Sequence, residues 1–252
     1  MITRQALVTY LAELLSIERF RDYAPNGLQV EGREQIQRIV TGVSASQALL
    51  DRAIELQADA VLVHHGYFWK NEAAVVCGMK KRRLATLLKH DVNLFAYHLP
   101  LDAHPELGNN AQLAQILGIR SAALMDERET QGVGNIGVLE QPLSLAAFGL
   151  KVEQVLGRKP LLVQGGDHKI ERIAWCTGGA QGYIDVALRA GVDAYLSGEV
   201  SENTVHSARE NGIHYIAAGH HATERYGIKA LGEHLAAQFD LEAYFMDIDN
   251  PA

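Results

Sequence analysis

Side chains that could bind a metal ion gather at three places in the sequence, each directly after a short apolar run. The three groups are His64 and His65, then His98 and Asp102, and then His220, His221 and Glu224. Imidazole nitrogens with a few carboxylate oxygens suit Zn, Fe, Mn, Ni or Co, whereas Ca and Mg prefer sites richer in oxygen. A single histidine pair is most often structural, but three such groups together favour a metal site.

The first group ends the run Ala60–His65, whose small and branched residues predict a strand covered on both faces of a sheet. In an open parallel sheet, ligands gather at the carboxyl ends of the strands, so chemistry is expected at this strand end. Because side chains alternate along a strand, His64 and His65 cannot point the same way. They can reach two different points, which suits a pair of metal ions better than one.

In each of the other two groups, a histidine and an acidic residue are four positions apart: His98 and Asp102, and His220 and Glu224. A helix that begins at His220 would place Glu224 on the same face, where both could bind one ion or straddle two. Pro100 prevents a regular helix between His98 and Asp102. The histidines on ordinary amphipathic patterns are expected to take no part, and these are His90, His168, His206, His214 and His234.

The composition allows a large core, in one domain or in two smaller ones. The chain has 252 residues, 48% of them hydrophobic, and 23 basic against 30 acidic residues give a net charge of −7. This charge argues against direct binding to a nucleic-acid backbone, which needs clustered basic residues. No secretory or membrane-spanning segment is visible in the sequence, so a cytoplasmic protein is expected.

The order of strands and helices repeats along the chain. Arg38–Gly66 aligns without a gap with Arg172–Val200, and Val92–Ala96 corresponds to Ile213–Ala217. Chance matching of two amphipathic units could give part of this similarity, but the ungapped alignment favours a duplication. We therefore expect an α/β fold of two related three-layer α/β/α halves, 1–125 and 126–252, built from duplicated βαβαβ units. The dinuclear metal site is expected in the crevice between the halves.

Five segments of the chain together resemble the Nif-three-like family, whose members are often called GTP cyclohydrolase 1 type 2 homologues. These segments are Asp22–Gln29, Val63–Gly66, His98–Asp102, Ser197–Glu199 and Gly219–Glu224. The resemblance covers essentially the whole chain and is especially close to the short enterobacterial-type member. It implies two divalent transition-metal ions in a two-domain α/β protein that assembles as a toroidal homohexamer, a trimer of dimers.

The resemblance also implies a set of metal ligands. It assigns His64 and Asp102 as ligands of one ion and His65 and His220 as ligands of the other. Glu224 would bridge the two ions. His98 would stand beside them, either facing the substrate or supporting the ligands. The connector at 126–132 is too short for the extra domain that larger relatives carry between the halves.

The expected function is a metal-dependent hydrolase that acts on a nucleotide-like or other small substrate. Two divalent ions would lower the pKa of water to near neutrality and polarise the bond under attack. In a reaction that opens the ring of GTP, the attacked atom is C8 of the purine, and His98, or in second place Glu199 or His104, moves the protons. The alternative is a metal-binding hexameric scaffold or interaction protein without turnover.

Overall fold

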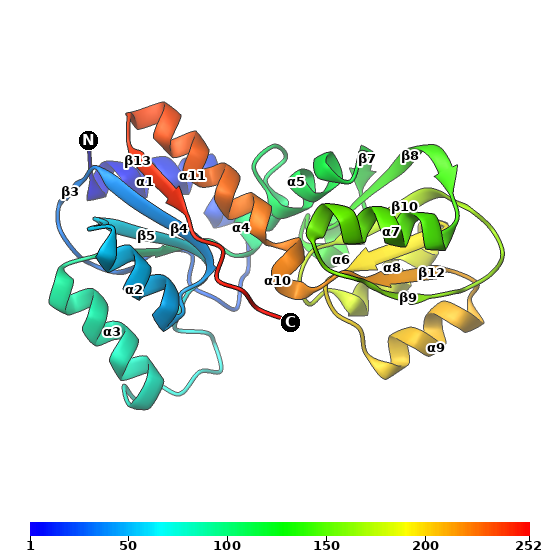
Figure 1. Ribbon diagram of the computed structural model, residues 1–252, viewed down its shortest axis with the longest axis horizontal. Coiled ribbons are helices and arrows are strands. Elements are labelled where there is room, and N and C mark those ends of the chain that lie inside the picture. The colour runs from blue at the N-terminus through cyan, green and yellow to red at the C-terminus, as the bar shows by residue number, and fades with distance from the viewer. The chain divides into compact units, whose positions relative to one another are not determined.

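The computed structural model describes the backbone of residues 1–252 and all side chains except those of Glu127 and Glu129 (Figure 1). These two side chains belong to the connector predicted between the halves, and they lie outside the described residues. The chain forms two compact units. Unit 1 contains 1–101 and 227–249, and unit 2 contains 102–226 and 250–252.

Unit 1 is built on a five-stranded sheet with the strand order β13-β4-β5-β6-β2. Four of these strands are parallel, and the edge strand β2 runs antiparallel to β6. The strands are β2 (Gly27–Val30), β4 (Arg38–Ser44), β5 (Ala60–His65), β6 (Asn93–Ala96) and β13 (Glu242–Phe245), while β1 (Ile2–Thr3) pairs with β3 (Gln35–Ile36) in a separate ribbon. The predicted bounds of β5 are confirmed, and its residues are buried up to His64.

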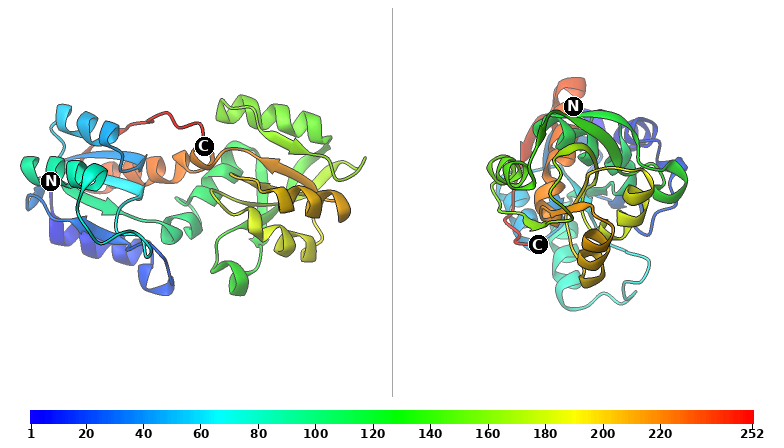
Figure 2. Two further views of the ribbon diagram at one scale, coloured as in Figure 1. Left: turned by 90° about the horizontal axis from the view of Figure 1, so that it is seen from below. Right: turned by 90° about the vertical axis from the view of Figure 1, so that its right-hand side faces the viewer.

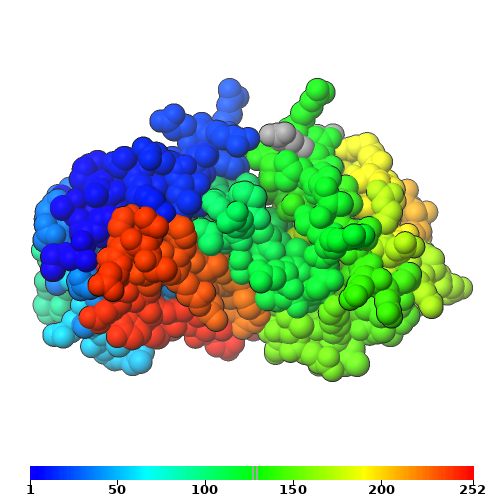
Figure 3. All heavy atoms as spheres, turned by 90° about the horizontal axis from the view of Figure 1, so that it is seen from above, coloured from blue at the N-terminus to red at the C-terminus, as the bar shows by residue number. Residues whose placement is uncertain are grey.

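Helices cover both faces of this sheet, and Figure 2 shows α1 and α2 on opposite sides of it. The helices of unit 1 are α1 (Arg4–Leu14), the 3-10 helix η1 (Ile17–Arg19), α2 (Gln47–Glu55), α3 (Gly78–His90) and most of α11 (Arg225–Phe239). α2 and α3 pack on the face that presents Val61 and Val63. α11 covers the other face and lies beside α1, where Tyr10 contacts Phe239 (Figure 3).

Unit 2 is built on a six-stranded mixed sheet with the order β7-β8-β10-β11-β12-β9. Its strands are β7 (Ile119–Leu124), β8 (Asn135–Leu143), β9 (Leu161–Val163), β10 (Ile170–Cys176), β11 (Ala194–Ser197) and β12 (His214–Ala217). Only β10, β11 and β12 pair in parallel among these, and the other three described strands are antiparallel to their neighbours. The parallel strands therefore form the centre of this sheet.

The helices of unit 2 also lie on both faces of its sheet, with α7 and α9 on opposite sides (Figure 2). They are α5 (Asn109–Ile116), α6 (Glu127–Thr130), α7 (Leu145–Leu156), the 3-10 helix η2 (Gln181–Tyr183), α8 (Ile184–Arg189), α9 (Glu202–Glu210) and α10 (His220–Thr223). The short helix α4 (Leu99–Ala103) passes from unit 1 to unit 2. None of the helices in the described part of the chain has both the length and the apolar character needed to span a membrane.

The central strands of the two units pair in the same register. Ile39 of β4 lies opposite Ala60 of β5, and Ile173 of β10 lies opposite Ala194 of β11. These are the positions that the ungapped sequence alignment matches. The shared register supports the duplication inferred from the sequence.

One polar contact is repeated as well. The Asp59 carboxylate accepts hydrogen bonds from the backbone N–H groups of Gln37 and Arg38 at the start of β4, both at 2.8 Å. Asp193 accepts the same two bonds at the start of β10, at 2.9 and 2.8 Å. Each carboxylate thereby fixes the beginning of the first parallel strand in its unit.

The compact units differ from the halves predicted from the repeat, 1–125 and 126–252. α5 and β7 precede residue 125 but belong to unit 2, because Ala114 and Ile119 share one apolar core with Trp175. β13 lies near the end of the chain but belongs to unit 1, because it pairs with β4. Packing between segments far apart in the sequence thus sets the division.

We expect Asp59→Ala and Asp193→Ala to destabilise the protein to a similar degree. Each variant removes the acceptor for two backbone N–H groups, so the free energy of unfolding should fall by about 1–3 kcal/mol. Asp51→Ala is the matched control, because Asp51 is exposed on α2 and accepts from Gln47 of the same helix. Urea unfolding followed by circular dichroism measures all three, and a wild-type midpoint in Asp59→Ala would contradict the role given to this carboxylate.

Candidate metal centre

Three imidazoles come together at the carboxyl ends of two parallel strands in unit 1. His64 and His65 end β5, and His98 follows β6. One ring nitrogen from each lies within 4.8 Å of the others. His64 and His98 are buried, and His65 is half-buried. The expectation that the strand ends gather these histidines is therefore met within this unit.

Each of the three imidazoles is held through its Nδ1 atom. The contacts are His64 to the carbonyl oxygen of Tyr97 at 2.9 Å, His65 to Ser44 Oγ at 3.2 Å, and His98 to Asp22 Oδ1 at 2.9 Å. A carbonyl and a carboxylate can only accept, so His64 and His98 carry a proton on Nδ1. In the neutral ring this leaves the lone pair on Nε2, which is the usual state of a histidine that binds a metal ion.

Asp22 is a buried carboxylate at the centre of a dense set of hydrogen bonds. Besides His98, it accepts from the backbone N–H groups of Ala24 at 3.1 Å and Leu99 at 3.0 Å, and from Asn26 Nδ2 at 2.9 Å. Burial raises the pKa of Asp22, but the hydrogen bonds from His98, Asn26 and Ala24 outweigh it and hold the pKa at about 2. Asp22 is therefore a fixed anion that orients the His98 ring.

Gln29 ties the Asp22–Gln29 segment to the residues after β5. Its Oε1 accepts from the backbone N–H of Tyr67 at 2.7 Å, and its Nε2 donates to the carbonyl oxygens of Tyr67 at 3.1 Å and Pro25 at 2.9 Å. Gly66 allows this approach, because a Cβ there would lie 2.2 Å from Gln29 Oε1. A side chain at this position would push the two loops apart.

Unit 2 presents a second set of side chains that could hold a metal ion. Asp102 and Glu224 are buried, and a carboxylate oxygen of one lies within 4.8 Å of an oxygen of the other. His220 Nε2 lies 3.1 Å from Glu224 Oε2, which confirms that the spacing of four residues brings the two side chains together. Glu224 thus lies near both Asp102 and His220, and two acids with an imidazole are a donor set that fits a divalent transition-metal ion.

His220 is also held through Nδ1, which lies 2.7 Å from Glu199 Oε1. Burial lowers the pKa of His220, but the carboxylates of Glu224 and Glu199 outweigh it and raise the pKa to about 9. Glu199, predicted as a second proton carrier, is thus placed against the ring of a predicted ligand. Glu199 thus contacts Nδ1 of His220 in the way that Asp22 contacts Nδ1 of His98.

The other two members of this set are positioned by hydrogen bonds and by small residues. Asp102 Oδ1 accepts from Asn109 Nδ2 at 2.9 Å and from Thr177 Oγ1 at 3.3 Å. Gly178 has φ +66° and makes room for Glu224, because a Cβ at Gly178 would lie 2.0 Å from Glu224 Oε1. The sequence places this glycine in a glycine-rich turn after β10, but only the structure shows its role beside Glu224.

Two remaining candidates lie apart from these ligand sets. His104 Nδ1 accepts from the backbone N–H groups of Glu106 and Leu107, so its ring closes a turn. The backbone N–H of His221 donates to the carbonyl oxygen of Ala252 at 3.3 Å. Among the described residues, the groups of three or more neighbouring metal-capable side chains contain neither of them.

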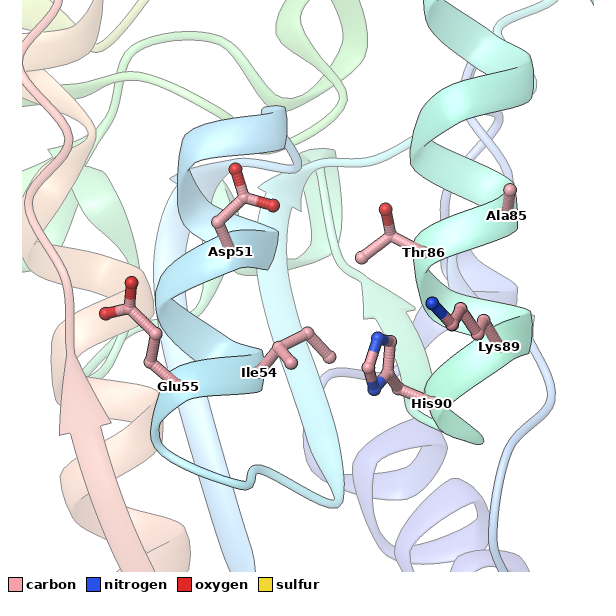
Figure 4. A pocket seen from close by; sticks show the side chains of 7 residues that line it. All are labelled: Asp51, Ile54, Glu55, Ala85, Thr86, Lys89 and His90. Carbon is pink, nitrogen blue, oxygen red and sulfur yellow. The ribbon is translucent and has the colours of Figure 1, made fainter.

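A surface groove of about 430 Å³ lies between α2 and α3 in unit 1 (Figure 4). Asp51 and Glu55 line it from α2, and Lys89 and His90 line it from α3. The described residues that form its walls include none of the predicted ligands. The groove is therefore separate from the candidate metal centre.

The family profile described as "Duf34/NIF3 (NGG1p interacting factor 3)" matches residues 2–251. A protein of Pseudomonas aeruginosa is 59% identical over 251 residues, which cover 100% of this chain and 99% of the relative. A protein of Escherichia coli (strain K12) is 58% identical and covers 95% of this chain and 96% of the relative. Both carry the name "GTP cyclohydrolase 1 type 2 homolog".

Two solved structures have the same fold over the full length of this chain and of their own. The structure described as "protein ybgI, unknown function" has a TM-score of 0.96 at 55% sequence identity. TTHA1606 from Thermus thermophilus has a TM-score of 0.90 at 37% identity. The resemblance inferred from the five sequence segments is thereby confirmed.

We expect the stabilising effect of Asp22 to depend on pH in the protein stripped of metal. Its pKa of about 2 in the folded state lies below the unfolded value of about 3.9. The carboxylate therefore contributes about 2 kcal/mol above pH 5, and this contribution is lost as the pH falls from about 4 towards 2. Thermal unfolding from pH 3 to 6 should show a gap between wild type and Asp22→Asn that narrows at low pH. Asp51→Asn is the control, and a gap independent of pH would contradict the account.

Proposed function

The chain belongs to the Duf34/NIF3 family, and from this premise we propose that it is a metal-dependent hydrolase of a nucleotide-like small substrate. The observation that carries the proposal is the state of the histidines. His64 and His98 donate from Nδ1 to fixed acceptors, so Nε2 is the atom that would bind a metal ion or a proton in the neutral ring. His65 contacts Ser44 at Nδ1, and His220 contacts Glu199 at Nδ1 and Glu224 at Nε2. The name of the relatives supports a nucleotide as the substrate.

We propose that the chain holds one pair of divalent ions, with the ligands that the family resemblance implies. His64 and Asp102 would hold one ion, His65 and His220 would hold the other, and Glu224 would serve both. The donor set fits this use, because imidazole nitrogens and a few carboxylates suit Zn, Fe, Mn, Ni or Co. The fixed ring of His64 and the hydrogen-bonded carboxylate of Asp102 support the assignment, since such outer contacts orient metal ligands.

The chain's own residues then orient the ligands and move protons. Divalent ions in such a site activate water and polarise the bond under attack. His98 exchanges a proton through Nε2, while Asp22 holds Nδ1 and so keeps the ring in the required tautomer. Glu199 orients His220 through the contact of 2.7 Å at Nδ1. Both carboxylates act through the histidine that they hold.

We also propose a cytoplasmic homohexamer, a trimer of dimers arranged as a toroid. Exposed apolar side chains on unit 1 support self-association, because an assembly would remove them from water. Val75 is 67% exposed, Val76 is 53% exposed and Met79 is 56% exposed, all between β5 and the first turn of α3. The measurement that fixes the assembly is the molar mass in solution from light scattering.

Glu224→Gln should lower the metal content more than the loss of a histidine that is assigned to one ion, because Glu224 is assigned to both ions. We expect about two divalent ions per chain in the wild type and at most about one in the variant. Mass spectrometry of the purified, desalted proteins measures this ratio. Glu233→Gln is the matched control, since its side chain is 68% exposed on α11. Equal metal content in Glu224→Gln and wild type would remove the bridging role.

Turnover is the second test of the proposal. The protein loaded with Mn, Fe or Zn is incubated with GTP and other nucleotides, and hydrolysed products are detected by liquid chromatography with mass spectrometry. His98→Ala should lower the rate by about a hundredfold or more, as expected for loss of a general acid or base. His206→Ala, an exposed histidine on α9, should keep the full rate. If no nucleotide is turned over, the scaffold without turnover becomes the better description.

A further inference from the structure

Two aromatic side chains from separate loops lie beside the imidazoles of unit 1, and the proposed hydrolysis does not use them. The ring of Tyr23 is 5.0 Å from that of His98, measured between centroids. The ring of Trp69 is 5.2 Å from His98 and 5.8 Å from His65. Tyr23 and Trp69 are 5.6 Å apart with 34° between their planes. Together they form an aromatic surface, here called the Tyr23–Trp69 pair, next to the imidazole cluster.

The Tyr23–Trp69 pair is accessible to solvent, whereas the His98 imidazole that it contacts is buried. Tyr23 is 54% exposed and Trp69 is half-buried, whereas His98 is 6% exposed. Exposed aromatic surface beside a group of candidate catalytic residues is a feature of binding sites rather than of a folded core. A ligand that covers Tyr23 would therefore lie directly beside the imidazole cluster.

Hydrogen bonds hold the ring of Trp69 and the backbone of Tyr23. Trp69 Nε1 donates to the carbonyl oxygen of Gly66 at 3.2 Å, and the backbone N–H of Lys70 donates to the carbonyl oxygen of Tyr23 at 2.8 Å. Glu72 Oε2 accepts from the backbone N–H of Trp69 at 3.2 Å. A ring fixed in the way that Trp69 is fixed loses little conformational entropy when a ligand packs on it, which favours binding.

We propose that the Tyr23–Trp69 pair binds a flat heteroaromatic ring of the substrate, such as a purine. This inference rests on the proposed function and deepens it, because it names the residues that bind the base of a nucleotide-like substrate at the same site. A flat ring is the partner that an exposed aromatic face accepts best, by stacking. Stacking tolerates different bases, so the pair selects nucleobase-like substrates as a class. Tyr23 directly follows Asp22 in the chain, so one loop carries both the stacking ring and the carboxylate that orients His98.

Tryptophan fluorescence can report on this surface. The chain contains two tryptophans. Trp175 is fully buried in unit 2, where its Nε1 donates to the carbonyl oxygen of Asn110. A ligand that stacks on the pair should therefore change the emission of Trp69 alone. The probe is GMP added to the metal-loaded protein, and the comparison ligand is ribose 5-phosphate, which has the sugar and phosphate but no base.

GMP should quench the emission in a saturable way, and ribose 5-phosphate should not at the same concentrations. Tyr23→Ala should raise the dissociation constant of GMP by about ten- to a hundredfold, the usual effect of losing one stacked ring. Tyr23→Phe keeps the ring and should restore binding to near the wild-type value. Tyr244→Ala is the control, because Tyr244 is an exposed tyrosine of the same unit, 38% exposed on β13. Metal content is measured for every variant, so that a general loss of the site is recognised.

Equal quenching by ribose 5-phosphate, or unchanged GMP affinity in Tyr23→Ala, would overturn the inference. Failure of the proposed function looks different. If nucleotides are hydrolysed but Tyr23→Ala leaves KM unchanged, the aromatic site is wrong and the hydrolase stands. If GMP binding depends on the Tyr23 ring but no nucleotide is turned over, the aromatic site stands and the hydrolase does not.

Discussion

The hydrogen bond at Nδ1 of each site histidine is the contact on which the candidate metal centre depends. A free imidazole rotates about its side-chain bonds and exchanges its proton between two nitrogens. Here Tyr97 and Asp22 fix the rings of His64 and His98, and an acceptor at Nδ1 leaves the lone pair on Nε2. Ligands oriented in advance lose little freedom when an ion binds, so these outer contacts are as much a part of the site as the ligands.

The sheet brings these groups together because consecutive parallel strands end at the same edge. β5 and β6 pair in parallel, so the histidines that follow their buried segments reach one place without any strain in the strands. The segment from Asp22 to Gln29, which runs into β2, contacts the residues at this edge. Its Asp22 holds His98, its Gln29 holds the backbone of Tyr67, and its Tyr23 faces the same imidazole. One short segment thus supports the cluster, the turn after β5 and the aromatic surface.

Much of the fold was predictable from local patterns, and the rest was not. The apolar run of β5 and the matched central strands of the two units follow from the sequence alone. The edge strands β2 and β7 were not expected. β2 begins at the glycine of Pro25-Asn26-Gly27, a sequence typical of turns, and in β7 only Ile119 is buried, so neither shows the alternation of a strand. The division into units also escaped prediction, because it depends on the pairing of β13 with β4 across most of the chain.

The candidate metal-binding residues could be predicted from the sequence, but the residues that position them could not. Chemistry and spacing name seven candidates, and the resemblance to the family selects five of them as ligands: His64, His65, Asp102, His220 and Glu224. Asp22 could not be assigned, because it meets His98 across 76 positions of sequence. Glu199 was expected to carry protons, and only the structure places it at Nδ1 of His220. Gly178 has a role only through the space that it leaves for Glu224. Supporting residues act through contacts between distant segments, which no local pattern encodes.

Anomalous diffraction from crystals of the metal-loaded protein tests the central claim most directly. The account predicts two peaks per chain, with Nε2 of His64, His65 and His220 as ligands and Glu224 in contact with both ions. Ligation through Nδ1, or metal peaks away from Glu224, would contradict it.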